Sequence, residues 1–247
     1  MKVGILGGTG PAGSALAVRL ASVGCEVCIG SRSAERAAGI ASELAGRWPE
    51  RDLALAGAAN EDACRAEMVV LAAPWAGAAS LASSLSPALE GRVVVSMVNA
   101  LEKVGDEMQA LVPPRGSMTV AVQQALPRSL VAGAFHHVPA RALSRLDHPL
   151  DADVLVCSDH PEAIDATIRL VELIPGCRGI AAGSFSAAGA VEAFTAVLVG
   201  INIARKAHSS IRLTGLGALG RGAPGPGAPG TPGPESDPAA ESPPTRG

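Results

Sequence analysis

Aromatic residues are nearly absent from this 247-residue chain, which has no Tyr, three Phe and two Trp. Proteins that bind single-stranded nucleic acid stack bases on aromatic side chains. Runs of Lys or Arg are absent as well, and the formal net charge is −3. A nucleic-acid-binding face would need a cluster of basic residues. We therefore expect no nucleic-acid partner.

The sequence also lacks the features of a secreted protein. Its five cysteines are an odd number, and glycines interrupt the apolar N-terminus MKVGILGGTG, with no cleavage pattern after it. We expect free thiols in a reducing cytoplasm. Cys25 and Cys28 have the CxxC spacing of redox and zinc sites, but no second CxxC completes a metal site. No metal ligands are predicted.

One segment, residues 186–204, is long and apolar enough to cross a membrane. Glu192 lies near its middle, where a charge would be costly in hydrocarbon. We therefore favour a buried helix at a domain or subunit interface over a transmembrane helix. This interpretation predicts a homodimer and no membrane partner.

Hydrophobic residues make up 48% of the chain, and up to about residue 96 short aliphatic runs alternate with helical stretches. This alternation is typical of βαβ units in a parallel sheet. We predict a Rossmann-like α/β fold, with a doubly wound, mainly parallel sheet and a small, mainly helical C-terminal region. The predicted strands are residues 3–6, 26–30, 53–56, 68–73, 93–96, 130–135 and 154–157, and the predicted helices are 11–23, 34–45, 161–173 and 187–212.

A glycine-rich turn, Gly8-Thr9-Gly10-Pro11-Ala12-Gly13, directly follows the first predicted strand and opens the first predicted helix. Gly8 permits a tight turn, Gly10 lets the backbone approach a pyrophosphate, and Gly13 allows close packing of helix and strand. Free N–H groups at the start of the helix can bind an anion. The motif in this position predicts dinucleotide binding; the alternative is a glycine-rich turn without a ligand.

The residues after the second predicted strand indicate which dinucleotide is bound. NAD sites have Asp or Glu there, which bonds the ribose hydroxyls. This chain has Ser31 and Arg32 instead, with Arg36 about one helical turn further on. Guanidinium groups match phosphate oxygens geometrically, so the charges favour NADP over NAD. The alternative is that Ser31 caps the second helix and Arg32 is solvated.

Two further segments are candidates for a second pocket. Ala73-Pro74-Trp75 follows the fourth predicted strand, where the chain overlies the cofactor in this fold; the alternative is an ordinary surface helix start. His136 and His137 are adjacent, so on an extended segment they point to opposite faces and do not predict a metal site. One of them can line a substrate pocket. No essential acid or base is predicted, because the sequence has no GxSxG motif, no His–Asp pairing suggested by spacing and only three lysines. Transfer between two redox cofactors would need mainly ring stacking and exclusion of water.

With these residues in place, the chain resembles the NADPH-dependent reductases of the deazaflavin coenzyme F420, from Met1 to about Leu216. The resemblance implies that Thr9, Ser31, Arg32 and Arg36 face the 2′-phosphate of NADP. It also implies that residues 136–140 and parts of the last helix form a deazaflavin pocket, with Val98 near the junction of the rings. The matching motifs are Leu6-Gly7-Gly8-Thr9-Gly10, Gly30-Ser31-Arg32, Pro74-Trp75, His136-x-x-Pro139-Ala140 and Asn202-Ile203-x-Arg205.

Two positions depart from the family pattern. His137 stands where family members have a small hydroxyl residue, and residues 96–100 lack the proline-rich pattern of archaeal members. Both departures concern the second substrate more than NADP.

The resemblance predicts hydride transfer between C4 of the nicotinamide of NADP(H) and C5 of coenzyme F420. The alternatives are an NADPH-dependent reductase of a small carbonyl or imine, and an NADP-sensing regulator without enzymatic activity. The residues expected to bind the two cofactors are Gly8, Thr9, Gly10, Pro11, Ala12, Gly13, Ser31, Arg32, Arg36, Ala73, Pro74, Trp75, Val98, His136, Val138, Pro139 and Ala140.

The predicted organisation has three parts. Residues 1–140 form the NADP-binding domain, and residues 141–216 form a smaller C-terminal domain. Residues 217–247 are rich in Gly and Pro, with nothing apolar after Leu219 to anchor a core, so we predict a disordered tail. Glycine does not keep a three-residue period there, which excludes a collagen helix.

Overall fold

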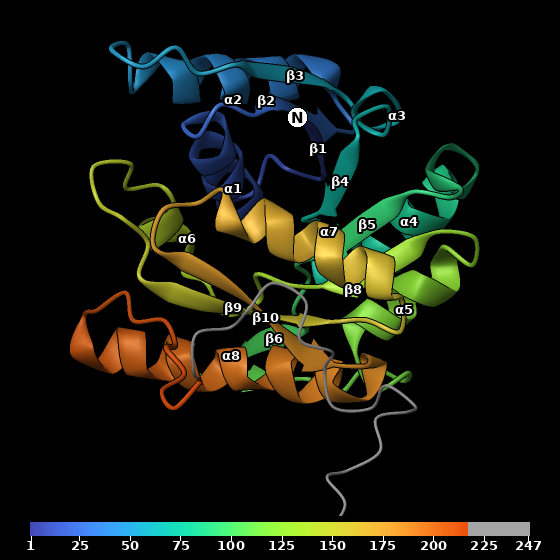
Figure 1. The fold of residues 1–247 in the computed structure, drawn as a ribbon, viewed down its shortest axis with the longest axis vertical. Coiled ribbons are helices and arrows are strands. Elements are labelled where there is room, and N and C mark those ends of the chain that lie inside the picture. Colours follow the sequence, from blue (N-terminus) through green and yellow to red (C-terminus); the bar gives the residue numbers. More distant parts are fainter. Residues whose placement is uncertain (217–247) are drawn as a thin grey trace, which may run out of the picture.

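A computed structural model describes residues 1–216, and the predicted tail at 217–247 lies outside the described residues. The fold is built on one eight-stranded sheet with the order β10-β9-β8-β5-β4-β1-β2-β3 (Figure 1). Its strands are β1 (Lys2–Leu6), β2 (Glu26–Ser31), β3 (Leu55–Ala59), β4 (Met68–Leu71), β5 (Val93–Ser96), β8 (Leu130–Gly133), β9 (Ala152–Cys157) and β10 (Cys177–Gly183).

Six of these strands, from β3 to β8 in the sheet order, are mutually parallel. Their order is the doubly wound order of dinucleotide-binding folds, with the switch point between β1 and β4. The predicted Rossmann-like fold is therefore confirmed. β9 pairs with β8 in the antiparallel sense, and β10 is parallel to β9. The C-terminal region thus adds two strands to the same sheet.

Helices cover both faces because successive side chains of each strand point to opposite sides. In β4, Val70 packs in one cluster with Val3 and Ile5, whereas Val69 packs in another with Leu6. The first face carries α1 (Pro11–Ala21), α2 (Ala34–Gly46) and α7 (Pro161–Glu172), with α6 (Ala140–Leu143) against α1. The second carries α3 (Asn60–Ala63), α4 (Trp75–Leu89) and α5 (Met118–Ala125).

The remaining elements lie at the end of the molecule opposite α2 and β3 (Figure 1). A hairpin of β6 (Leu101–Val104) and β7 (Glu107–Ala110) packs against α8 (Phe185–Arg205). By length and composition alone, α8 is the one helix among the described residues that could cross a membrane. Its buried face packs on α5, β9 and β10.

Several predicted bounds were wrong. The third strand is β3 at Leu55–Ala59 rather than residues 53–56, because its partner β2 pairs with residues 55–59. The last helix ends at Arg205 rather than at residue 212, because Lys206 takes a left-handed conformation with φ 51°. Arg212 is therefore not at a helix end.

Candidate functional site

The predicted site segments lie along the carboxyl-terminal edge of the parallel strands. Backbone hydrogen bonds link their starting points: the N–H of Ala72 donates to Leu6 O (2.9 Å), and that of Met97 donates to Leu71 O (3.1 Å). The N–H of Ala134 donates to Ser96 O (3.0 Å). The glycine turn, the segment before α4, the loop at Val98 and the histidine segment are consequently neighbours. Ligands of open α/β sheets bind at this edge.

The glycine turn has the geometry of an anion site. The left-handed residue of the turn is Gly7, with φ 63°. Gly8 is required because a Cβ there would lie 2.7 Å from Ile5 O, and a Cβ on Gly13 would lie 2.7 Å from Gly8 Cα. Gly10 caps α1 without a side-chain hydrogen bond and has open space beside it. The first N–H groups of α1 are therefore free to bind phosphate.

Asn60 supports this turn, and sequence reasoning missed it. Its side chain is 3% exposed, and Oδ1 accepts a hydrogen bond from the N–H of Gly7 at 3.0 Å. The same oxygen would lie 2.8 Å from a Cβ on Gly30. An amide residue directly after β3, at the carboxyl edge, was the available sequence signal.

At the end of β2, Ser31 is buried and its Oγ accepts a hydrogen bond from the N–H of Ser33 at 3.2 Å. The cap of α2 is Ser33, whose Oγ accepts from the N–H of Arg36; Ser31 is thus not the cap. Arg32 and Arg36 are exposed, and neither forms an ion pair within residues 1–216. Two guanidinium groups are therefore available to a phosphate.

The segment after β4 lies against the glycine turn. A Cβ on Gly7 would be 2.9 Å from Ala73 Cα, so the two backbones nearly touch. Trp75 is the first residue of α4, and Pro74 is its N-cap. The segment therefore does begin a helix, as the alternative interpretation expected. The Trp75 side chain is 39% exposed, which leaves an aromatic surface at the edge of the turn.

The histidine segment is not extended throughout, contrary to the expectation. Phe135 is fully buried with φ 63°, a strained conformation for an aromatic residue. Because of this turn, His136 and His137 are both buried, at 5% and 3% exposure. Burial, with a smaller effect of His137, lowers the pKa of His136 to about 3. Burial also lowers the pKa of His137 to about 4, and its Nε2 accepts from the N–H of Leu155.

Two polar residues that were not predicted as site residues lie next to His136. Asn99 Nδ2 donates to the backbone oxygen of His136 at 2.8 Å and ties the loop after β5 to the histidine segment. Glu192 of α8 places its Oε1 3.8 Å from His136 Nε2. Val98, Val138, Pro139 and Ala140 complete this wall; Val98 and Val138 are buried, and the other two are half-buried.

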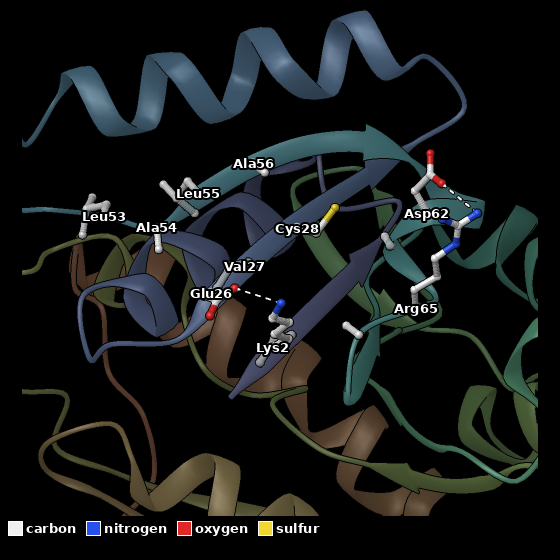
Figure 2. Close-up of a pocket in the computed structure, with 13 residues that line it drawn as sticks. Lys2, Glu26, Val27, Cys28, Leu53, Ala54, Leu55, Ala56, Asp62 and Arg65 are labelled. Carbon is white, nitrogen blue, oxygen red and sulfur yellow. Dashed lines mark ion pairs between the residues drawn. The ribbon is translucent and has the colours of Figure 1, made fainter.

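A cavity of about 550 Å³ lies elsewhere, against the β1–β2–β3 half of the sheet (Figure 2). Figure 2 shows two ion pairs beside it, Lys2 with Glu26 and Arg65 with Asp62. Its walls include the amino-terminal residues of β1 and β2. None of the predicted site residues lines this cavity.

Comparison with known proteins gives consistent family matches. The family described as NADP oxidoreductase, coenzyme F420-dependent, matches residues 2–100. The F420-dependent NADP reductase of Methanocaldococcus jannaschii is 38% identical over 224 residues, covering 87% of this chain and 99% of that protein. The F420-dependent NADP reductase of Methanothermobacter marburgensis is 34% identical over 222 residues, with the same coverage of both chains.

Solved structures share the fold. A protein from Arthrobacter sp. FB24, provisionally described as an F420-dependent NADP-reductase, superposes with a TM-score of 0.71 at 24% identity. That match covers 85% of this chain and 97% of the other. An imine reductase of Streptomyces aurantiacus gives a TM-score of 0.52 at 21% identity, covering 82% of this chain and 62% of its own.

Proposed function

Because the chain belongs to the family of F420-dependent NADP reductases, we propose that it transfers a hydride between C4 of the nicotinamide of NADP(H) and C5 of coenzyme F420. The observation that carries this proposal is identity of 34–38% to curated F420-dependent NADP reductases over nearly their whole length. The order of the strands and the free anion site at the start of α1 fit the nucleotide part of the reaction.

NADP binds along the carboxyl edge in this proposal. Residues 8–13 hold the pyrophosphate, and Ser31, Arg32 and Arg36 hold the 2′-phosphate. The support is the absence of a carboxylate at the end of β2 and the presence of two exposed guanidinium groups there. Thr9 is half-exposed beside them in the turn and adds a hydroxyl donor.

The second ring binds against the nicotinamide. Ala73, Pro74 and Trp75 bound the slot on one side, and Val98 with residues 136–140 bounds it on the other. Apolar, water-excluding walls suit direct hydride transfer, since F420 and NADP carry the redox chemistry and the protein supplies orientation. No residue of this chain is assigned as an essential acid or base.

The test is to mix the protein with NADPH and F420 and to follow the visible absorbance of the oxidised deazaflavin. We expect its loss in proportion to NADPH consumed. NADPH oxidation with small carbonyls or imines but not with F420 would support the runner-up reductase. NADPH binding without any turnover would support a sensor instead.

We further propose that the enzyme is a cytoplasmic homodimer that meets through α8. Phe194, Val197 and Ile201 are 40%, 53% and 44% exposed on one side of the helix, at the spacing of a helical stripe. An exposed apolar stripe of this kind is typical of a subunit interface. The five free cysteines are consistent with a reducing compartment.

A further inference from the structure

Glu192 is an unusual residue for its place in the fold. It is the one charged side chain in α8 before Arg205, and it is 5% exposed. A buried carboxylate is costly unless it is paired or hydrogen-bonded. Helix α8 thus carries one group whose burial requires an explanation.

Three hydrogen bonds from α5 hold the carboxyl group in place. Glu192 Oε2 accepts from the N–H of Met118 at 2.7 Å, and Oε1 accepts from the N–H and the Oγ1–H of Thr119 at 2.9 and 2.8 Å. These donors lie in the first turn of α5, where the helix dipole also favours a negative charge. Burial raises the pKa of Glu192, although these hydrogen bonds oppose the rise. The position of Glu192 Oε1 is therefore fixed.

His136 faces this oxygen and lacks its own partners. Its side chain is 1% exposed, its Nε2 lies 3.8 Å from Glu192 Oε1, and neither ring nitrogen has a hydrogen-bond partner among residues 1–216. Nearly all buried polar atoms in folded proteins are paired. Asn99 donates to the backbone oxygen of His136 and holds the chain at this point. A small movement of the ring toward Glu192 would bring His136 Nε2 within hydrogen-bond distance of Glu192 Oε1.

We propose that Glu192 is a positioning residue that sets the tautomer and orientation of His136 for the second substrate. The carboxylate accepts the Nε2–H of a neutral His136, which leaves Nδ1 without a proton. The ring held in this orientation fixes the wall that Val98, Val138 and Pro139 complete, and the second substrate packs against that wall. This inference rests on the proposed function, because it assigns that substrate to the His136 wall.

A double-mutant cycle in the full-length enzyme tests the pairing. We expect Glu192→Gln to raise the KM for F420 about tenfold, the effect of losing one hydrogen bond of about 1.4 kcal/mol, while the KM for NADPH changes less than about twofold. In a His136→Asn background, Glu192→Gln should have no further effect, because the two groups act as one unit. Equal changes in both KM values, or an undiminished effect in that background, would overturn the proposal.

Thr195→Val is the matched control on the same helix. Thr195 is buried one turn after Glu192, and its Oγ1 has no partner among residues 1–216. The substitution keeps the volume and removes an unused hydroxyl, so both KM values should stay within about twofold of the wild type. A tenfold rise in the KM for F420 here would mean that any disturbance of α8 has the same effect.

A spectroscopic measurement tests the pairing without a variant at position 192 and without turnover. The ring nitrogen shifts of the chain's five histidines are measured by 15N NMR, and His136 is assigned from the His136→Asn variant. We expect His136 to carry its proton on Nε2. A proton on Nδ1 would refute the role of Glu192, whereas failure of the wild-type enzyme to reduce F420 would refute only the proposed function.

Discussion

At the scale of single residues, the proposed preference for NADP rests on the end of β2. Arg32 and Arg36 follow a strand that ends in Ser31, and Glu35, an exposed acidic residue between them, belongs to the first turn of α2. An arginine fork can bond two phosphate oxygens at once. The 2′-phosphate is the one group that distinguishes NADPH from NADH, so in the proposed site selectivity depends on these guanidinium groups.

We expect Arg32→Glu to raise the KM for NADPH by at least about tenfold, because a carboxylate repels the 2′-phosphate and one charge-assisted hydrogen bond is lost. The KM for NADH should change less than about threefold. Steady-state kinetics with each nucleotide measure the two values. Arg169→Glu, an exposed site on α7, makes the same change of charge and should alter neither. Equal effects of Arg32→Glu on both nucleotides would contradict the assignment.

Single residues also show the limit of reasoning from sequence. The glycine turn and the arginines were found because local spacing carries their chemistry. Asn60, Asn99 and Glu192 were not found, because each acts on a segment more than 30 residues away. Glu192 was recognised as out of place in an apolar helix, but nothing in the sequence identifies α5 as its partner.

At the scale of elements, Arg19 holds α1 against α6 and the segment that follows α6. Its side chain is 3% exposed, and its guanidinium donates to the carbonyl oxygens of Ala142, Leu143, Arg145 and His148 at 2.6–3.2 Å. α1 begins at the nucleotide turn, and α6 begins at Ala140. One buried side chain therefore joins the two halves of the proposed site.

Arg19→Met keeps the apolar stem of the side chain and removes all four bonds. We expect a loss of about 3 kcal/mol in the free energy of unfolding, because several buried carbonyl groups are left without partners. Arg92→Met provides the comparison, since Arg92 donates to a single carbonyl, that of Ala66, at 2.7 Å. It should cost about 1 kcal/mol. Urea denaturation measures both, and equal losses would contradict the role of Arg19.

A second link holds the segment after α8 on β9 and β10. Asp153 is fully buried and accepts hydrogen bonds from Arg178 (2.6 Å), Arg212 (2.8 Å) and the N–H of Leu213 (2.6 Å). Burial alone would raise the pKa of Asp153, but these donors lower it well below 3.8. Arg212 therefore fastens this segment instead of extending the helix.

We expect Asp153→Asn to reduce the free energy of unfolding by about 2 kcal/mol at pH 7, a moderate value because both guanidinium groups are partly exposed. Since the folded pKa is depressed, the stabilisation is present above pH 4 and declines as the pH falls below that value. The difference between wild type and variant should therefore shrink between pH 4 and pH 2. Denaturation at several pH values tests this.

The surface pair of Asp147 with Arg51 is the control for this prediction. The two groups lie 3.7 Å apart, and the Asp147 side chain is 65% exposed. Asp147→Asn should change the free energy of unfolding by less than about 0.5 kcal/mol. If the difference in the free energy of unfolding between wild type and Asp153→Asn does not vary with pH, the ionised form of Asp153 is not what stabilises this segment.

Strands with strong local patterns were predicted, whereas β10 was missed and β3 was predicted with the wrong bounds. The sequences of β1, β4 and β5 are short aliphatic runs, a pattern typical of buried strands in a parallel sheet. β10 has the sequence CRGIAAG and β3 has LAGAA; with few β-branched residues, both depend on pairing with a neighbour. The hairpin of β6 and β7 turns at Gly105, with φ 60°, a signal that was present but not used.

At the scale of the whole molecule, α8 has two different sides. The inner side contains Glu192 and Thr195, and the outer side contains Phe194, Val197 and Ile201. A helix of 21 residues is about 31 Å long, which is enough for a continuous contact with a second copy. The same element thus supports the site and offers an interface.

If the proposed dimer forms through α8, we expect Val197→Asp to raise its dissociation constant at least about tenfold, because a carboxylate would be buried without a partner. Analytical ultracentrifugation over a range of protein concentrations measures this. Val112→Asp is the control at an apolar residue that is 85% exposed on a loop, and it should leave the assembly unchanged. A wild-type protein that is monomeric at all concentrations would contradict the interface.

The fastening of Arg212 and Leu213 to Asp153 also has a practical consequence. When the protein is immobilised on a sensor surface through its C-terminus, tension along the chain first reaches the hydrogen bonds of Arg212 and Leu213 to Asp153. These bonds transmit the tension to β9 and β10 before it can reach α8. The glycine turn, between β1 and α1, is not among the residues that hold this segment. Attachment through the C-terminus should therefore strain β9 and β10 first and leave the proposed NADP site without direct strain.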